Sequence, residues 1–421
     1  QTLYYNFRWA GLLKNDPCCS LPGRVWIASL VRLPNWKEGK VRNKDRQRVV
    51  LLRSNPVAPD PRVESTGKAL LNAGYSVSIV GWDRTGVSSH QEFVLGIPIS
   101  HFHLRAEYGS GIKNLKKVFQ WQIFLWQWLR KHKSDYDILH ACDFDTVLPA
   151  LWSKWLYKKR VVYDIFDFYA DHLRNTPSLL KRVIRWLDYW AISHADAVII
   201  ADDARREQIF GSHPRKLVVI HNTPDDLLVP AASNEEQIFT ITYVGILQLE
   251  RGLLEMIEVV QKHPEWRLEL AGFGGDEEVI RTAAAVSPNI RWHGQIDYET
   301  ALDLSRRASV LFATYDPAIP NHRYSSPNKI FEAMMLGKPV IVSRDTNMDT
   351  IVREAECGLV IPYGDPPALE TALLQLSTDI GLRDRLGKNA RLAYETRFSR
   401  KIMNDRLLSL YAEIQEGEGQ D

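Results

Sequence analysis

The stretch SSPNKIFEAMMLGKPVIV, residues 325–342, is the most informative part of the sequence. Ser326 and Pro327 suit the cap and first position of a helix, whose free first-turn amides form an anion site. Lys329 would add positive charge there, and Glu332, one turn later, could accept hydrogen bonds from two ribose hydroxyls. The pattern predicts the phosphate and ribose end of a nucleotide site. The alternative is an ordinary capped amphipathic helix with an internal Lys–Glu pair.

Around this stretch, short apolar runs alternate with amphipathic segments, which predicts two α/β units with parallel, doubly wound sheets. In the second half we expect strands at 239–244, 267–271, 290–292, 310–313, 339–342 and 358–361. In the first half we expect strands at 49–53, 75–82, 138–140, 161–164, 197–201 and 217–221. Ligands of such sheets bind outside the carboxyl ends of the strands, so we expect the site in the cleft between the two units.

The predicted domains are an N-terminal domain at 48–226, a linker at 227–237 and a C-terminal domain at 238–398. Residues 1–47 form an extension to which we assign no structure, and the end of the chain, 384–414, is helical by its periodicity. Two further turns lie on the predicted edge of the C-terminal domain. They are YVG followed by Arg251 and Gly252, and AGFG with Gly272 and Gly274.

The 421 residues carry a formal net charge of +2, which argues against a dedicated nucleic-acid binder. Residues 1–235 hold 33 Lys and Arg against 23 Asp and Glu, so the first half is basic and the second acidic. We therefore expect the first half to face an anionic partner. Four cysteines favour a reducing, cytoplasmic compartment, and no apolar run reaches membrane-spanning length. The start shows no signal-peptide pattern, and its first residue, Gln, is consistent with trimming.

With these motifs, together with IRWHG at 290–294 and HNTP at 221–224, the chain resembles the GT-B nucleotide-sugar glycosyltransferases of the retaining family 4 type. The resemblance implies two Rossmann-like domains facing a cleft, with a C-terminal helix, 399–421, packing back on the first domain. It implies a UDP- or GDP-sugar donor, a hexosyltransferase-like activity and no required cofactor. The donor-binding residues implied are Gly245, Arg251, Gly272, Gly274, Gly294, Ser326, Asn328, Lys329 and Glu332.

The chain departs from the family pattern at four positions, which are Tyr324, Ile246, Cys142 and Phe166. Tyr324 stands where the first glutamate of the family's Glu, seven residues, Glu motif falls, and Ile246 stands where an arginine is common. In ILHACDFD, the family's His-x-His-Asp has become His-x-Cys-Asp. The resemblance still predicts His140 and Asp143 as catalytic residues. Asp145, Asp164 and Asp167 are expected on the acceptor and sugar side.

The segment Asp143-Phe144-Asp145 also permits a metal-binding Asp-x-Asp reading, typical of the single-sheet GT-A enzymes. We predict no metal, because Arg251, Lys329 and helix N-termini would neutralise the diphosphate. A plainer alternative is that Asp143 or Asp145 caps the helix that follows.

The segment 113–133, KNLKKVFQWQIFLWQWLRKHK, places Trp and Leu between basic ends, which suits an interfacial helix on an anionic membrane surface. A second candidate is 179–190, and the alternative for both is a core helix with basic flanks. We expect a cytoplasmic protein, peripheral on the inner face of the plasma membrane.

The function predicted is sugar transfer, with retention, to a lipid-linked or polysaccharide acceptor in cell-surface glycan biosynthesis. The alternatives are a GT-B enzyme acting on a soluble acceptor and a catalytically idle GT-B scaffold. A dinucleotide oxidoreductase is disfavoured, because SNPVAP at 54–59 follows the first strand in place of G-x-G-x-x-G.

Overall fold

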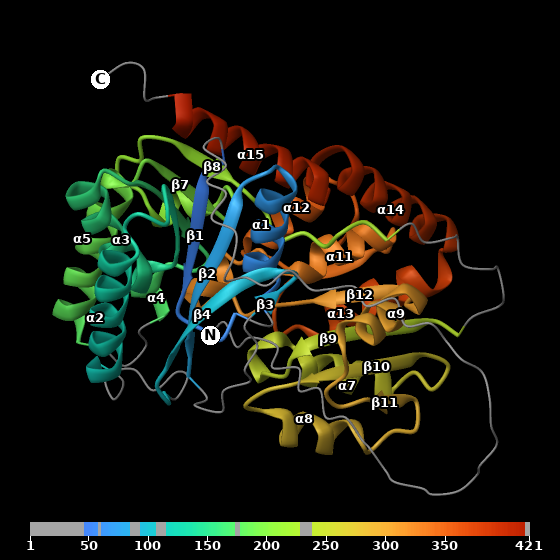
Figure 1. The fold of residues 1–421 in the computed structure, drawn as a ribbon. Helices are drawn as coiled ribbons and strands as arrows, with labels where there is room; N and C mark the ends of the chain where they lie inside the picture. The colour runs from blue at the N-terminus through green and yellow to red at the C-terminus, as the bar shows by residue number, and fades with distance from the viewer. Residues whose placement is uncertain are drawn as a thin grey trace, which may run out of the picture.

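The computed structural model describes residues 46–57, 60–84, 93–106, 115–172, 177–227 and 238–416. The predicted extension lies outside the described residues apart from its last two positions, and so does the predicted linker after Leu227. Within the described residues the strands form two separate sheets (Figure 1). The predicted α/β fold class with two doubly wound parallel sheets is confirmed.

The first sheet runs in the order β3-β4-β2-β1-β5-β6-β7-β8, and its neighbours are parallel except for β3 and β4. Its strands are β1 (Arg48–Arg53), β2 (Ser76–Asp83), β3 (Phe93–Val94), β4 (Ile97–His103), β5 (Ile138–Cys142), β6 (Arg160–Ile165), β7 (Ala197–Ile200) and β8 (Leu217–Val219). The helices between them are α1 (Pro61–Asn72), α2 (Leu115–Lys131), α3 (Phe144–Tyr157), α4 (Tyr169–His172), α5 (Ser178–His194) and α6 (Arg205–Gln208).

Alternate side chains of these strands enter two different cores, one on each face of the sheet. One core joins the sheet to α2, α3 and α5, which lie side by side in Figure 1. The other joins it to α1 and to α15 (Arg400–Glu416), the last helix of the chain. The first sheet is therefore covered on both faces, as a parallel sheet requires.

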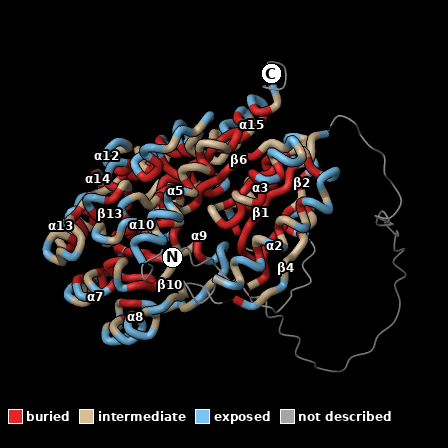
Figure 2. Tube along the Cα trace, turned by 90° about the vertical axis from the view of Figure 1, so that its left-hand side faces the viewer, coloured by how far each residue is buried: buried red, intermediate tan, exposed pale blue. Residues whose placement is uncertain are grey.

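The second sheet has the order β11-β10-β9-β12-β13-β14 and is parallel among its described neighbours. Its strands are β9 (Thr240–Ile246), β10 (Arg267–Phe273), β11 (Ile290–Trp292), β12 (Val310–Ala313), β13 (Val340–Ser343) and β14 (Gly358–Ile361). Its helices are α7 (Leu253–Gln261), α8 (Glu277–Ala284), α9 (Tyr298–Arg307), α10 (Pro320–Arg323), α11 (Asn328–Leu336), α12 (Asn347–Glu354), α13 (Pro366–Thr378) and α14 (Ile380–Ala393). Figure 2 shows the buried residues concentrated in the strands and exposed residues along the outer helices.

The end of the chain crosses from the second sheet to the first, although not as one helix. The periodic segment 384–414 divides at a π-helical turn, Tyr394–Phe398, and an extended residue, Ser399, before α15 begins. The Tyr394 hydroxyl donates to the carbonyl of Pro224 at 2.9 Å, which ties the turn to the connection between the sheets. Helix α15 then packs on the first sheet, where Tyr411 is fully buried.

Strands β3 and β4 are absent from the sequence-based prediction. Strand β4 pairs with β2 and has only a two-residue antiparallel neighbour, so most of its side chains are not fully buried. Its sequence, IPISHFH, therefore lacks the continuous apolar run that marks the inner strands.

A buried carboxyl group links α5 to the first sheet. Asp188 is fully buried, and the Tyr163 hydroxyl of β6 donates to its Oδ1 at 2.7 Å. Burial raises the pKa of Asp188 from 3.8 to about 7, with the Tyr163 hydrogen bond opposing the shift. Between these two values the unfolded carboxyl is ionised while the folded one keeps its proton.

Replacing Asp188 with Asn keeps an acceptor for Tyr163 and removes the ionisation. The stability of the native protein contains a contribution from Asp188 that is lost as the pH rises from about 4 to about 7, by up to ~1.4 kcal/mol per pH unit. We therefore expect the difference in melting temperature, Asp188→Asn minus native protein, to increase as the pH is raised from about 5 to about 8. The exposed Asp203→Asn serves as the control, and parallel curves for Asp188→Asn would contradict the prediction.

Candidate active site

The carboxyl edges of the two sheets contact each other. The Tyr324 hydroxyl, which follows α10 in the second unit, donates to Glu207 Oε2 of α6 in the first at 3.2 Å. The ring of His221, which follows β8, lies 5.2 Å from the ring of Phe331 in α11. Residues after the strands of both sheets are therefore close enough to serve one ligand, as expected for sheets of this kind.

After the first strand of the second sheet lies a buried guanidinium with two donor atoms unpaired among the described residues. Arg251 is only 8% exposed and lies 3.7 Å above the ring of Tyr315. Its Nε and Nη1 atoms make no hydrogen bond with the described residues, and the same is true of the buried Ser326 Oγ. Buried donors are normally paired, so these two side chains are suited to an anionic ligand.

Lys329 brings a second cation to the same place. Its Nζ lies 4.5 Å above the ring of Tyr243, and a Cβ atom added at Gly245 would overlap it. Burial raises the pKa of Tyr243, while the charges of Lys329 and Arg251 act to lower it. Both cations are therefore near one phenol at the end of β9, which is where the sequence predicted a diphosphate.

The start of α11 differs by one residue from the prediction. Pro327 occupies the cap position and Asn328 is the first helical residue, so Ser326 does not cap the helix. The φ of Pro327, −74°, would also suit a helix, but its ψ of 143° makes it extended, so the helix begins one position later than expected. This shift leaves the Ser326 hydroxyl available to a ligand.

Glu332 lies one turn further along α11, on the same side as Lys329. Its Oε1 accepts a hydrogen bond from the Tyr298 hydroxyl at 3.4 Å. Burial raises the pKa of Glu332, and the charge of Lys329 opposes this. The side chains predicted to bind the phosphate and the ribose, Lys329 and Glu332, thus lie on one face of α11, and Tyr298 of α9 contacts Glu332.

The predicted donor-site glycines hold the strand ends together. Gly245 and Gly272 have φ angles of 151° and 142°, and a Cβ atom on Gly272 would overlap the carbonyl oxygen of Gly245. The Gly272 amide donates to the carbonyl of Gly294 at 2.8 Å. A Cβ on Gly274 would lie 2.6 Å from the carbonyl oxygen of Leu247. Gly272 and Gly274 are therefore required by backbone packing alone, whereas a Cβ at Gly245 would meet the flexible end of Lys329.

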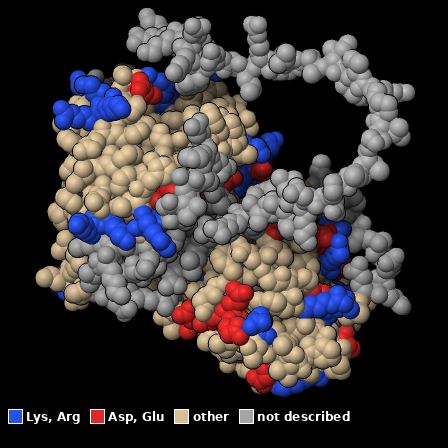
Figure 3. All heavy atoms as spheres, turned by 60° about the horizontal axis from the view of Figure 1, so that its bottom comes forward, with Lys and Arg blue, Asp and Glu red and all other residues tan. Residues whose placement is uncertain are grey.

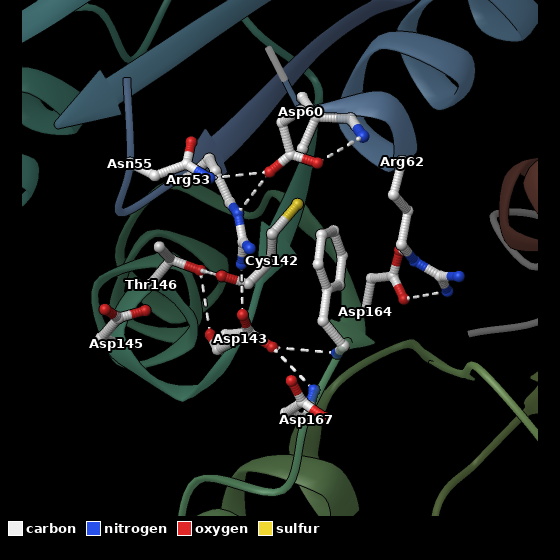
Figure 4. A network of polar contacts seen from close by, with 12 residues as sticks. Arg53, Asn55, Asp60, Arg62, Cys142, Asp143, Asp145, Thr146, Asp164 and Asp167 are labelled. Carbon is white, nitrogen blue, oxygen red and sulfur yellow. Dashed lines mark hydrogen bonds and ion pairs between the residues drawn. The ribbon is translucent and has the colours of Figure 1, made fainter. Parts of the chain in front are cut away.

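On the first sheet, Asp143 belongs to a network of polar contacts (Figure 4). Its Oδ2 forms an ion pair with Arg53 at the end of β1, and its Oδ1 accepts from the amides of Phe166 at 2.9 Å and Asp167 at 3.3 Å. Asp143 occupies the N-cap position of α3, as one alternative predicted, but its side chain makes no capping hydrogen bond. The carboxylate already has three donors, so the structure gives it a role in holding β1, β5 and β6 together.

His140 does not reach the edge where a ligand could bind. It is fully buried, with Nδ1 2.9 Å from the Tyr411 hydroxyl and Nε2 3.3 Å from Asp164 Oδ2. Asp164 in turn pairs with Arg62 at 2.6 Å. A catalytic residue must touch the reacting atoms, and His140 faces α15 instead. The catalytic role of His140 stays a prediction, and the contacts of its ring also suit a positioning role in which it orients Asp164.

The two carboxylates of the Asp-x-Asp segment face different cations. Asp145 is buried with Oδ2 3.6 Å from Arg84, whereas Asp143 pairs with Arg53. Asp167, a third carboxylate expected here, accepts from Arg205 at 3.0 Å. Among the described residues, no group of three His, Cys, Asp or Glu side chains is arranged to hold a metal ion.

Sequence reasoning missed the two arginines of this network. Phe166, which replaces a histidine of the family pattern, has Arg53 4.1 Å from its ring centre on one side and Arg62 at 4.9 Å. Arg53 directly follows the apolar run VVLL of β1, which is the one local signal that could have identified it. Cys142 is buried beside these groups, and burial raises the pKa of its thiol well above the usual value.

Two family models match the chain. Residues 58–223 match the glycosyl transferase 4-like domain, and residues 239–379 match the glycosyl transferases group 1. Similar folds are found in the sucrose-phosphate synthase of Thermosynechococcus elongatus, with a TM-score of 0.67, 17% identity and 88% of this chain covered against 100% of that chain. Anabaena HepE in complex with UDP gives a TM-score of 0.68 at 15% identity, with 87% of this chain and 100% of that chain covered. The chain belongs to the GT-B glycosyltransferases of the family 4 type.

Curated relatives match part of the chain. The capsular polysaccharide biosynthesis glycosyltransferase CapM of Staphylococcus aureus is 28% identical over 43% of this chain and 48% of its own length. The phosphatidyl-myo-inositol mannosyltransferase of Mycobacterium leprae is 25% identical over 60% of this chain and 67% of its own length. The match thus spans about half the length of the first relative and about two thirds of the second. In the described part of the chain, no helix is long and apolar enough to span a membrane.

Replacing Gly272 with Ala should prevent the close approach of β9 and β10, because its Cβ would overlap backbone that cannot move aside. We expect a fall in melting temperature of several degrees or loss of folded protein. Gly275→Ala is the matched control, since a Cβ there meets nothing within 4 Å. Equal stability of the two variants, measured by thermal unfolding, would refute this account of the glycines.

Proposed function

We propose that this protein transfers a sugar from a nucleotide-sugar donor to a glycan or lipid-linked acceptor in cell-surface glycan biosynthesis, with retention of anomeric configuration. The observation that supports it most directly is the buried Arg251 guanidinium, whose Nε and Nη1 atoms have no hydrogen-bond partner among the described residues, and which lies with Lys329 near Tyr243. The relatives' names include capsular polysaccharide synthesis and transfer to phosphatidyl-myo-inositol, and Anabaena HepE has been solved with UDP-glucose.

In this proposal the two cations and the first amides of α11 stabilise the diphosphate as it leaves. Glu332 accepts hydrogen bonds from the ribose, and backbone near Gly294 meets the base of a UDP- or GDP-sugar. The chemistry requires charge stabilisation where the phosphate–sugar bond breaks and the exclusion of bulk water. No cofactor enters this scheme.

Retention is assigned to attack by the acceptor on the face that the diphosphate leaves, with the departing phosphate taking the acceptor proton. A double displacement would need a carboxylate nucleophile. Two carboxylates expected on the first-sheet side of the site, Asp143 and Asp167, already form ion pairs with Arg53 and Arg205. Asp145, Asp164 and Asp167 accordingly shape the acceptor side in this proposal, and Asp143 positions the loop that carries Phe166.

We place the protein in the cytoplasm, peripheral on the inner face of the plasma membrane, with an anionic membrane surface as its partner through residues 113–133. Helix α2 carries the exposed Lys116, Arg130 and Lys131, although Trp121 and Leu125 of its apolar run are buried in the core. The basic ends, with the exposed Phe119 and Ile123 of the run, would therefore contact lipid. Lys113 lies outside the described residues.

Two other functions remain as alternatives, a GT-B enzyme with a soluble acceptor and an idle GT-B scaffold. The substitutions at Tyr324, Ile246, Cys142 and Phe166 favour the scaffold. The unpaired donors at Arg251 favour a protein that still binds an anion. Hydrolysis of a UDP- or GDP-sugar, or transfer to a lipid-linked acceptor, would distinguish an enzyme from a scaffold.

The donor site can be tested by thermal shift with UDP, GDP and inorganic pyrophosphate, since a ligand that binds the folded state raises its melting temperature. Arg251→Ala and Lys329→Ala each remove a charged donor, so both nucleotide and pyrophosphate binding should weaken by roughly 10- to 100-fold. Glu332→Ala should weaken nucleotide binding and spare pyrophosphate, because it acts on the ribose.

Lys388→Ala, which removes an exposed cation of the same unit, is the control and should change neither ligand's shift. Transfer from UDP- and GDP-sugars to a lipid-linked acceptor should fall in the Lys329 and Glu332 variants. Unchanged turnover in both would show that the donor site is elsewhere.

A further inference from the structure

Helices α3 and α5 expose large apolar side chains on the outer side of the first sheet. On α3 these are Trp152, Trp155 and Leu156, and on α5 they are Leu179, Leu180, Val183 and Trp186. Trp152 is 52% exposed and Trp186 is 64% exposed. The two helices pack against each other, and the rings of Trp155 and Trp190 lie 5.4 Å apart. We call the exposed side of these two helices the α3–α5 face.

The α3–α5 face belongs to a larger surface without exposed acidic groups. Helices α2, α3 and α5 lie side by side and contain eight Lys and Arg residues, which are Lys116, Lys117, Arg130, Lys131, Lys154, Lys181, Arg182 and Arg185. Their only acidic residues are Asp145 and Asp188, and both are buried. In Figure 3 groups of Lys and Arg mark the first unit, and Asp and Glu gather on the second.

We propose that the α3–α5 face inserts into the interfacial layer of an anionic bilayer, with Trp152 and Trp186 as anchors. The inference rests on the proposed function, because insertion serves catalysis only if the acceptor is lipid-linked and held by the same bilayer. It changes the surface involved, because most apolar residues of α2 pack in the core and leave Phe119 and Ile123 exposed, whereas α3 and α5 together expose three tryptophans.

The residue types of the α3–α5 face fit a bilayer better than a second copy of the chain as its partner. Indole rings are favoured at the boundary between headgroups and acyl chains, and basic side chains beside them gain energy from anionic lipids. A symmetric dimer through this face would instead bring the basic residues of one copy against those of the other. Like charges at such a contact oppose association.

The topology connects the face to the candidate site. In a parallel α/β unit each helix begins at the carboxyl edge of the sheet and runs back along it. Helix α5 follows β6, whose end carries Asp164 and the Phe166–Asp167 loop. Leu179 and Leu180 in the first turn of α5 are therefore at the same edge as the site, and Trp155 and Leu156 are at the far end of α3. An acceptor anchored in the bilayer would reach the site from the α5 end.

The test uses sedimentation of the full chain with vesicles of phosphatidylcholine, with and without phosphatidylglycerol, at low and high salt. We expect binding to the anionic vesicles that salt weakens. The double variant Trp152→Gln/Trp186→Gln should lower the affinity by at least tenfold. The variant Lys181→Gln/Arg182→Gln should lower it by roughly fivefold for each charge removed.

Matched controls lie on α14 of the second unit. Ile380→Gln/Leu392→Gln replaces two exposed apolar residues, and Arg385→Gln/Lys388→Gln replaces two exposed basic ones, so neither should alter vesicle binding. The UDP thermal shift of every variant shows that it is folded and that its donor site is intact. This also separates the two proposals, because nucleotide binding can fail while vesicle binding persists, and the reverse.

Three results would overturn the proposal. The first is no binding to phosphatidylglycerol vesicles at low salt. The second is equal binding by the native chain and the Trp152→Gln/Trp186→Gln variant. The third is a dimer in light scattering that this variant converts to a monomer, which would make the α3–α5 face an interface between two copies.

Discussion

The ion pairs of Arg53 organise the first sheet at the edge where a ligand would bind. A guanidinium that is 2% exposed must be paired, since burying a charge without a partner is far more costly than any gain from packing. Asp60, which caps α1, and Asp143, which follows β5, both pair with it. Burial acts to lower the pKa of Arg53, and the two carboxylates raise it by more. One side chain therefore connects β1, α1 and β5.

The buried guanidinium near the second sheet differs from Arg53 in its pairing. Arg251 is almost as buried as Arg53, yet Nε and Nη1 have no partner among the described residues. Arg53, which is fully paired within the protein, supports the fold, whereas Arg251, with two unpaired donor atoms, is suited to a ligand. The same contrast holds for the carboxylates, because Asp143 and Asp164 are paired with arginines whereas Glu332 has a single long hydrogen bond from Tyr298.

Much of the donor side could be predicted from sequence, because its parts are local. Lys329 and Glu332 share a helical face by their spacing, and Gly245 and Gly272 end predicted strands. The acceptor side could not be predicted in this way. Whether His140 and Asp143 were free depended on Tyr411, 271 positions away, and on Arg53, 90 positions away. The apolar run of α2 likewise gave no indication of which side chains the core would take.

The sequence by itself determined the fold class, the two sheets and the helix that carries Lys329 and Glu332, because periodicity and helix-stop signals act over a few residues. Only the tertiary structure decided which charged groups are paired and which are not. It buries His140 against α15, pairs Asp143 with Arg53 and leaves Nε and Nη1 of Arg251 without a partner among the residues that the structure describes. The reason is that pairing depends on which distant strands and helices become neighbours, and a local sequence pattern does not predict these long-range contacts.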